Sequence, residues 1–338
     1  MRVRAIVNPR AGRGSRRAAE ALFRVRGVFE GAEVATTSRP GEARDLARDA
    51  AEEGCDVVLV AGGDGTTNEV AWGLLGSTTT LGLIPAGSGN GLGRVLGIPL
   101  DPDRALAALA SAETRLMDVG FVNGRPFLNV AGAGFDAAVG AAFQARGREG
   151  GTRSVFGYLQ LGLRKSWDYR AGKVVLEAGG ERFEGRALVV AFLNGRQYGG
   201  GAVVAPRALL DDGLLDCVIF EETPLLETLA NVPRLFLGGI ESFRAYRHIA
   251  AHEATLMTEK PLEHHRDGEP EAETSRLEVR LESRALRVLV PTKVLLDPAG
   301  AFASTERATA RRAEAGLPRT EAKDAPHPES FLLPRGSC

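Results

Sequence analysis

The first 117 residues alternate between strand-like and helix-like patterns, and this alternation restricts the fold more than any other feature of the chain. Strand-like runs occupy residues 2–8, 32–38, 56–63 and 80–87, and helix-like stretches occupy residues 15–27, 41–54, 66–76 and 101–113. The run at 56–63 is continuously apolar before its glycines, as expected of a parallel strand buried on both faces. Such alternation predicts a doubly wound α/β domain over residues 1–117.

The ends of these helices carry the usual boundary residues. Gly27 and Gly54 stand where the first two helices end, and glycine is common just past a helix C-terminus. Asp101 precedes the last helix and Pro102 is its first residue, which is the preferred order of an N-cap and a proline at position N1.

After residue 117 the pattern changes to β-branched segments punctuated by glycine, which predicts a β-rich antiparallel sandwich over residues 118–283. A returning segment near 284–300 is expected to complete the first domain. Residues 301–338 form a tail rich in Ala, Arg, Glu and Pro that is expected to pack little and to be flexible. Helical stretches at 153–167 and 224–239 interrupt the β pattern, and their apolar side chains belong either to the core or to a cleft for acyl chains.

Composition excludes several classes of protein. The 42 Lys and Arg residues balance 43 Asp and Glu, giving a net charge of −1, so no basic field predicts nucleic-acid binding. The three cysteines are far apart and show no metal-ligand spacing, which argues against a disulfide framework. No stretch approaches the ~20 apolar residues of a membrane span, and no secretory signal opens the chain. We therefore expect a cytoplasmic protein whose contact with a membrane is peripheral.

Three glycine-rich loops, at residues 8–14, 62–69 and 85–94, each follow a predicted strand. The carboxyl ends of parallel strands share one edge of the sheet, so the three loops are expected to meet in one crevice. Backbone N–H groups exposed by glycine at helix N-termini are suited to binding phosphate. One such loop is more simply a tight turn, but three on one edge favour a phosphate site. Nearby cations are Arg10, Arg13, Arg16, Arg17 and Arg94.

The spacing of these glycines excludes the two common nucleotide motifs. No lysine follows any of them, so there is no P-loop. The Rossmann pattern fails as well, because its last glycine position is Asn68 in the second loop and Leu92 in the third. A simple dehydrogenase or P-loop enzyme is therefore not predicted.

Six motifs in order resemble the diacylglycerol kinase catalytic-domain family, which includes soluble bacterial lipid kinases, sphingosine kinases and ceramide kinases. They are "VNPRAGRG", "VAGGDGTTNEV", "LGLIPAGSGNGLGR", "DVGFVNGRPFLNVAGAGFDA", "APRALLDDGLLD" and "HRDGEP". The resemblance covers roughly residues 3–295. It implies a nucleotide domain like those of 6-phosphofructokinase and NAD kinase, followed by a β-rich domain, with ATP and Mg²⁺ in the cleft.

The resemblance also implies which residues form the site. Glu269 matches the general base of the family, and Asp64 matches the essential acid of its GGDG motif. A structural Mg²⁺ would bind Asp212 and the backbone carbonyls of Leu209 and Leu214. The nucleotide would be contacted by Asn8, Pro9, Arg10, Ala11, Gly12, Thr37, Gly63, Asp64, Gly65, Thr66, Thr67, Asn68, Glu69 and Ser88.

For each group of acids, a purely structural role is a simpler alternative to a role in catalysis or metal binding. Phosphoryl transfer to a hydroxyl needs a carboxylate that accepts its proton, which Glu269 could supply. However, Asp267 and Gly268 in "DGE" are also a common hairpin turn. Asp211, Asp212 and Asp216 either bind a hard cation or form a solvated acidic turn.

Two positions depart from the family pattern. Ser88 stands where the family usually has Thr, and Gly91 stands where it often has Asp. Sphingosine kinases have an "AGSGN" form like this one and also lack that Asp. These differences leave the identity of the substrate open more than the kinase activity itself.

Five histidines offer no convincing metal site. His248 and His252 are four residues apart, a spacing that binds zinc only on a helix, whereas the segment around them is strand-like. His264 and His265 are adjacent, and we expect all four to be ordinary surface residues.

We therefore predict an ATP-dependent lipid kinase that phosphorylates a hydroxyl of a membrane lipid, diacylglycerol or a sphingoid-like molecule, at the inner membrane face. The lipid is expected to enter from the second domain, and Glu269 with Asp64 to handle the hydroxyl proton. A NAD-kinase-like enzyme with a soluble substrate and a non-catalytic nucleotide- or lipid-binding regulator are the alternatives.

Overall fold

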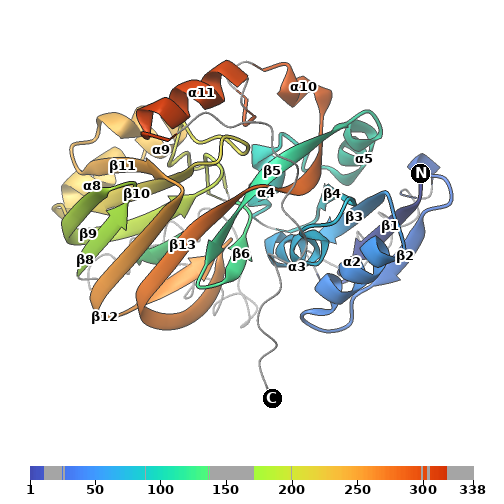
Figure 1. Cartoon of the computed structure of the whole chain (residues 1–338), viewed down its shortest axis with the longest axis horizontal. Helices are drawn as coiled ribbons and strands as arrows, with labels where there is room; N and C mark the ends of the chain where they lie inside the picture. The colour runs from blue at the N-terminus through green and yellow to red at the C-terminus, as the bar shows by residue number, and fades with distance from the viewer. Residues whose placement is uncertain are drawn as a thin grey trace.

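The computed structural model describes residues 1–10, 25, 27–87, 89–135, 137, 171–198, 200–297, 300–302 and 305–317. Its first part is a parallel sheet with helices (blue and cyan in Figure 1). The strands are β1 (Val3–Val7), β2 (Glu33–Thr36), β3 (Val57–Gly62) and β4 (Thr80–Pro85). They lie in the order β4-β3-β1-β2 with parallel pairing throughout. The doubly wound α/β fold predicted from the sequence is confirmed.

Four helices of this part are described. They are α2 (Glu42–Glu52), α3 (Asp64–Leu74), α4 (Gly91–Val95) and α5 (Pro102–Ala110). Three of them agree with the sequence pattern, and the Asp101 side chain caps α5 by accepting from the N–H of Arg104 at 3.1 Å. Helix α4 was not predicted, because its five residues are too few to show a helical period. The stretches predicted to be helical at 15–27 and 153–167 lie mostly or wholly outside the described residues.

The rest of the chain is dominated by antiparallel strands (green to orange in Figure 1). They are β5 (Glu113–Val122), β6 (Arg125–Phe127), β7 (Val130–Gly134), β8 (Gly172–Ala178), β9 (Glu181–Leu193), β10 (Leu215–Glu221), β11 (Tyr246–Ala251), β12 (Glu253–Arg266) and β13 (Glu269–Val290). The described strands form one 13-stranded sheet whose main path runs β11-β10-β9-β7-β12-β13-β4-β3-β1-β2.

One long strand, β13, belongs to both parts of the molecule. It has 22 residues, whereas the sequence predicted short segments. Its first half pairs with β12, and its second half pairs with β5. Near its end, Val288 pairs in parallel with Leu81 of β4. A register shift between Glu282 and Leu286, with Arg284 at φ 56°, lets the strand continue from one part into the other.

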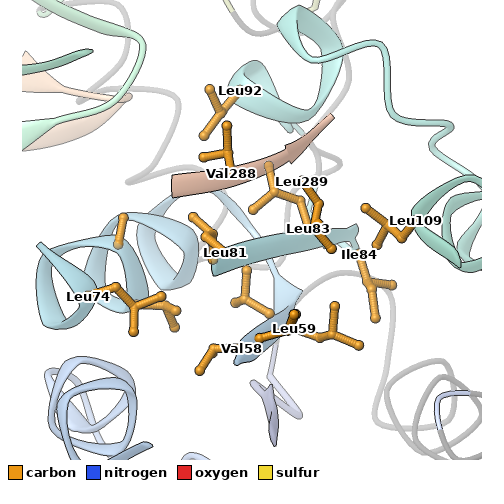
Figure 2. Close-up of a cluster of buried hydrophobic side chains, with 14 of the residues drawn as sticks. Val58, Leu59, Leu74, Leu81, Leu83, Ile84, Leu92, Leu109, Val288 and Leu289 are labelled. Atoms are coloured by element: carbon orange, nitrogen blue, oxygen red, sulfur yellow. The ribbon is translucent and has the colours of Figure 1, made fainter. Parts of the chain in front are cut away.

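Two large clusters of buried apolar residues support this arrangement. Figure 2 shows the cluster of the α/β part, where Leu59 and Leu81 from the parallel strands meet Leu74 of α3 and Val288 and Leu289 of β13. A second cluster lies among the antiparallel strands and includes Phe127 and Phe192, both fully buried. Full burial of each such side chain contributes roughly 1.5–3 kcal/mol, so β13 is anchored by its middle in the second cluster and by its last residues in the first.

The predicted helical stretch at 224–239 forms two short helices, α8 (Leu225–Asn231) and α9 (Arg234–Leu237), followed by η1 (Ile240–Ser242). Leu226 and Leu237 are 82% and 86% exposed, so these two leucines are not part of a core. No helix of the described residues is long and apolar enough to cross a membrane.

The chain ends its described part with α10 (Thr292–Leu295) and α11 (Thr305–Glu314). The sequence predicted a tail that packs little after residue 300. Within the described residues the tail instead forms a helix, and the Arg311 side chain on it is buried. The reason is electrostatic, because Arg311 lies against the buried carboxylates of Asp212 and Asp216.

Candidate active site at the ends of the parallel strands

The second and third glycine loops pack backbone against backbone where β3 and β4 end. The N–H of Ala86 donates to the carbonyl of Gly62 at 2.9 Å. A Cβ added at Gly87 would lie 2.6 Å from the Cα of Gly63, closer than real side chains come. The two loops can approach this closely only because both positions are glycine.

The first loop joins them through Asn8, which follows β1. Its amide Nδ2 donates to the Thr66 hydroxyl at 2.9 Å, and its Oδ1 accepts from the N–H of Arg10 at the same distance. The sequence predicted that the three loops meet at one edge of the sheet. Within the described residues, they do meet there. Ala11, Gly12 and Ser88, all predicted to contact the nucleotide, lie outside the described residues.

Asp64 holds the third loop with both of its carboxylate oxygens. Oδ2 accepts from the N–H of Asn90 at 2.8 Å, and Oδ1 accepts from the N–H of Gly91 at 2.7 Å. Burial raises the pKa of Asp64 to about 6, although the Gly91 N–H acts in the opposite direction, and the charge of Asp267 adds to the rise. The contact at residue 91 uses the backbone, so replacing the Asp common in the family by Gly91 does not remove it.

The N-terminus of α3 begins directly after this junction. Gly63 is its N-cap residue and no side chain caps the helix there. An uncapped helix N-terminus presents backbone N–H groups and a partial positive charge, which is the environment that phosphate oxygens prefer. Gly63, Gly65 and Thr66 of the predicted nucleotide set lie in this turn, followed by Thr67, which is half-buried.

Asn68, further along α3, connects the two parts of the molecule. Its Nδ2 donates to the Asp267 carboxylate at 2.9 Å and to the carbonyl of Pro126 at 3.1 Å. Asp267 also accepts three backbone N–H groups from residues 128–130, at 2.7 to 3.0 Å. Asp267 and Gly268 have φ of 46° and 85°, so they form the tight turn between β12 and β13. The carboxylate of Asp267 is thus used to fix this turn.

Glu269, the first residue of β13, follows the turn and is exposed. A Cβ added at Gly65 would lie 3.1 Å from its Oε1, so the Glu269 side chain lies directly against Gly65. Asp64 is the residue immediately before Gly65 in the chain. The fold therefore brings the two acids that the resemblance implied as catalytic to the same edge of the sheet.

Two further residues predicted to contact the nucleotide serve neighbouring elements. Glu69 Oε1 accepts from the N–H of Gly41 at 2.9 Å, at the start of α2. Thr37 is buried at the end of β2, and its N–H donates to the carbonyl of Val7 at 2.9 Å. Both residues stiffen the sheet edge from which the loops emerge.

An arginine side chain lies beside Asp212, which was predicted to bind Mg²⁺ together with the carbonyls of Leu209 and Leu214. Asp212 Oδ2 lies 2.9 Å from Arg311 Nη1, and Asp212 Oδ1 accepts from the N–H of Leu214 at 3.0 Å. The carboxylate is therefore paired with a guanidinium and holds one N–H group, while Oδ2 accepts no hydrogen bond from the described residues. Among the described residues, no group of three or more His, Cys, Asp or Glu side chains is arranged to hold a metal ion.

The histidines also differ from the sequence-based expectation of ordinary surface residues. His264 and His265 on β12 are only 8% and 7% exposed, and burial lowers the pKa of His264. His248 Nε2 lies 2.5 Å from Oδ1 of the buried Asp216. A strand pattern places alternate residues on opposite faces but does not say that both faces are covered.

Sequence reasoning missed one residue of the site, Arg266. It is buried, and its guanidinium donates to the carbonyl of Pro126 at 2.6 Å and to Glu271 Oε1 at 2.7 Å. Together with Asn68 it joins α3 to the turn that carries Glu269. The only signal in the sequence was its position beside "DGE".

Comparison with known proteins identifies the family of each part of the chain. The family described as "Diacylglycerol kinase catalytic domain" matches residues 2–122, and that described as "YegS C-terminal NAD kinase beta sandwich-like domain" matches residues 129–290. A Pseudomonas aeruginosa protein named "Probable lipid kinase YegS-like" is 34% identical over 266 residues, which cover 76% of this chain and 84% of the relative. The "Diacylglycerol kinase" of Bacillus subtilis is 33% identical over 245 residues, covering 70% of this chain and 79% of that relative.

A solved structure described as "A putative diacylglycerol kinase from Bacillus anthracis str. Sterne" superposes with a TM-score of 0.72 and 26% identity. The match covers 87% of this chain and 98% of that one. These findings confirm the resemblance seen in the six motifs. The chain therefore belongs to the diacylglycerol kinase catalytic-domain family, with the second domain typical of YegS, and it is a kinase.

Proposed function

We propose that this kinase transfers the γ-phosphoryl group of ATP to a hydroxyl of a membrane lipid, of the diacylglycerol or sphingoid class. The observation that carries the proposal is the contact between the Glu269 side chain and Gly65 at the N-terminus of α3. It puts a carboxylate beside the place best suited to the phosphates. Relatives named lipid kinase and diacylglycerol kinase support the lipid class.

The nucleotide would bind with its phosphates at the uncapped N-terminus of α3, against the backbone of residues 63–66. Mg²⁺ would arrive bound to the triphosphate and would neutralise its charge. Residues 8–12, Thr37 and Ser88 would border the rest of the nucleotide, as the family resemblance implies. Asn68 and Glu69 are engaged with other elements, so we assign them to positioning the loop.

In the transfer step, the lipid hydroxyl oxygen attacks the γ-phosphorus while Glu269 accepts the hydroxyl proton. A new oxygen–phosphorus bond forms, the bond between the γ-phosphorus and the β–γ bridging oxygen breaks, and ADP leaves. Asp64, beside this position, keeps the third loop in place through the N–H groups of Asn90 and Gly91. Exclusion of water by the lipid would favour transfer over hydrolysis.

The acceptor would be reached at the cytoplasmic face of the inner membrane, through peripheral contact only. The exposed leucines of α8 and α9 offer apolar surface for such contact. No nucleic acid is expected as a partner, because the chain has a net charge of −1.

The test is transfer of label from γ-labelled ATP, with Mg²⁺, to a panel of acceptors. The panel holds diacylglycerol, a sphingoid base, ceramide and monoacylglycerol in mixed micelles, and NAD in solution. Label in one or more lipids is expected. Label in NAD alone would replace the proposal by a NAD-kinase-like activity, and bound ATP without transfer to any acceptor would favour a non-catalytic regulator.

A further inference from the structure

A buried arginine lies between two buried carboxylates on the turn that was predicted to bind Mg²⁺. Arg311 of α11 is 8% exposed, and Asp212 and Asp216 are 2% and 0% exposed. Arg311 Nη1 lies 2.9 Å from Asp212 Oδ2, and Nη2 lies 2.7 Å from Asp216 Oδ1. One guanidinium thus bridges both acids. Figure 1 shows α11 lying over the β-rich part of the molecule, far along the chain from this turn.

The same guanidinium also contacts the backbone at the start of the turn, which we call the acidic turn and define as residues 207–216. Arg311 Nη1 donates to the carbonyl of Arg207 at 2.6 Å. The neighbouring Arg312 donates to the carbonyl of Asp212 at 3.1 Å. The N–H of Gly213 donates to the buried Asp118 at 2.7 Å. Two consecutive arginines therefore hold side-chain and backbone oxygens of the acidic turn.

A carboxylate buried at this depth is strongly destabilising when it is ionised without a nearby positive charge. A divalent ion would need several oxygens turned toward one point. Here Asp212 Oδ2 forms an ion pair with the guanidinium, Oδ1 accepts from the N–H of Leu214, and the carbonyl accepts from Arg312. Among the described residues, Asp212 Oδ2 and Asp216 Oδ2 accept no hydrogen bond, so the charge of Arg311 is what compensates them. The position where a cation would neutralise the turn is already filled by a cation of the chain.

We propose that the guanidinium of Arg311 is a built-in cation that takes the place of a divalent metal ion at the acidic turn. The turn then keeps its shape without metal, and it does so only when α11 is docked. This inference concerns the second domain and does not depend on which substrate the kinase phosphorylates.

The experiment measures thermal unfolding of the nucleotide-free full chain, in chelator and in millimolar Mg²⁺ or Ca²⁺. For wild type we expect the same melting temperature in both. Arg311→Ala should melt roughly 10 °C lower in chelator, because it removes the one guanidinium that pairs with both Asp212 and Asp216. It should regain a large part of that loss in Mg²⁺ or Ca²⁺, which can enter the space left by the side chain.

The matched control is Arg207→Ala. Arg207 also pairs with α11, through Glu314, but both side chains are about half exposed. Exposed ion pairs contribute little, so this variant should melt within about 3 °C of wild type and show no metal dependence. The proposal would be overturned if both variants lost the same amount of melting temperature, or if the melting temperature of Arg311→Ala did not depend on metal.

Two measurements keep the test decisive if Arg311→Ala does not fold. Arg311→Lys retains a cation and should fold, with an intermediate melting temperature and without gain from Mg²⁺. In a titration with Mn²⁺, wild type and Asp212→Asn should bind the same number of ions, because wild type is expected to bind none at Asp212. A Mn²⁺ ion bound by wild type and lost in that variant would show a metal site, and the proposal would be wrong. Neither readout involves lipid phosphorylation, so the result is separate from that of the proposed function.

Discussion

Glycine at a few single positions creates the space that the site uses. Gly65 has no side chain where Glu269 approaches, and Gly89 has none where the Asp64 carboxylate accepts its hydrogen bonds. A Cβ at Gly89 would lie 2.6 Å from Asp64 Oδ2. At the residue scale, glycines of the second and third loops are therefore required for the close approach of groups from elsewhere in the chain.

Gly87→Ala should test this requirement. Its Cβ would meet the backbone of Gly63, which cannot move aside as a flexible side chain can. We expect the KM for ATP to rise at least about tenfold, because the second and third loops must separate. Steady-state kinetics measure this. Gly27→Ala is the control, because its Cβ meets nothing within 4 Å, and its KM should equal that of wild type.

The raised pKa of Asp64 predicts a change of stability with pH. The folded state holds the proton more tightly than the unfolded chain, whose pKa is 3.8, so this contribution is full below about pH 4 and is lost as pH rises through about 6. Wild type should therefore be more stable relative to Asp64→Asn near pH 4 than near pH 7, by on the order of 2 kcal/mol. Urea unfolding at both pH values measures the difference, and a constant difference would contradict the prediction.

At the scale of elements, α3 has two tasks. Its N-terminus follows the junction of the loops, and Asn68 on its second turn contacts the turn between β12 and β13. The resemblance implied that Asn68 contacts the nucleotide, whereas the structure places its amide on Asp267 and on Pro126. Position within a motif does not reveal which of several nearby partners a side chain selects.

Asn68→Ala separates these two roles. If Asn68 positions the turn that carries Glu269, kcat should fall about tenfold while the KM for ATP stays unchanged, because the base is displaced and the phosphate site is not. Steady-state kinetics with ATP varied at saturating acceptor measure both constants. A raised KM for ATP with unchanged kcat would instead show that Asn68 contacts the nucleotide.

Other elements show what the sequence could and could not predict. Helices α2, α3 and α5 were predictable because each has enough length and a glycine, aspartate or proline at an end. Helix α4 has five residues and begins after Asn90 in a left-handed conformation, so no periodic signal marks it. The sequence of helix α11 is typical of a solvated charged segment. Nothing local indicates that Arg311 is buried, because its partner Asp212 lies about a hundred residues earlier in the chain.

At the scale of the whole molecule, β13 determines how the two parts meet. Its first residue is Glu269, and its last residues pack in the core of the α/β part with Leu59 and Leu81 (Figure 2). One strand thus fixes the carboxylate relative to the sheet that carries the glycine loops. The sequence indicated both domains through their patterns, but a single sequence does not show which strands pair across such a distance.

The most direct test of the site is the rate at which Glu269→Gln phosphorylates the lipid that wild type uses best. The variant keeps the shape of the side chain but cannot accept a proton, so kcat should fall by about 10²-fold or more. The KM for ATP and the melting temperature should stay unchanged, because residue 269 is exposed. Glu273→Gln, an exposed position on the same strand, should match wild type in all three. A kcat for Glu269→Gln within roughly threefold of wild type would contradict the assignment of Glu269 as the base.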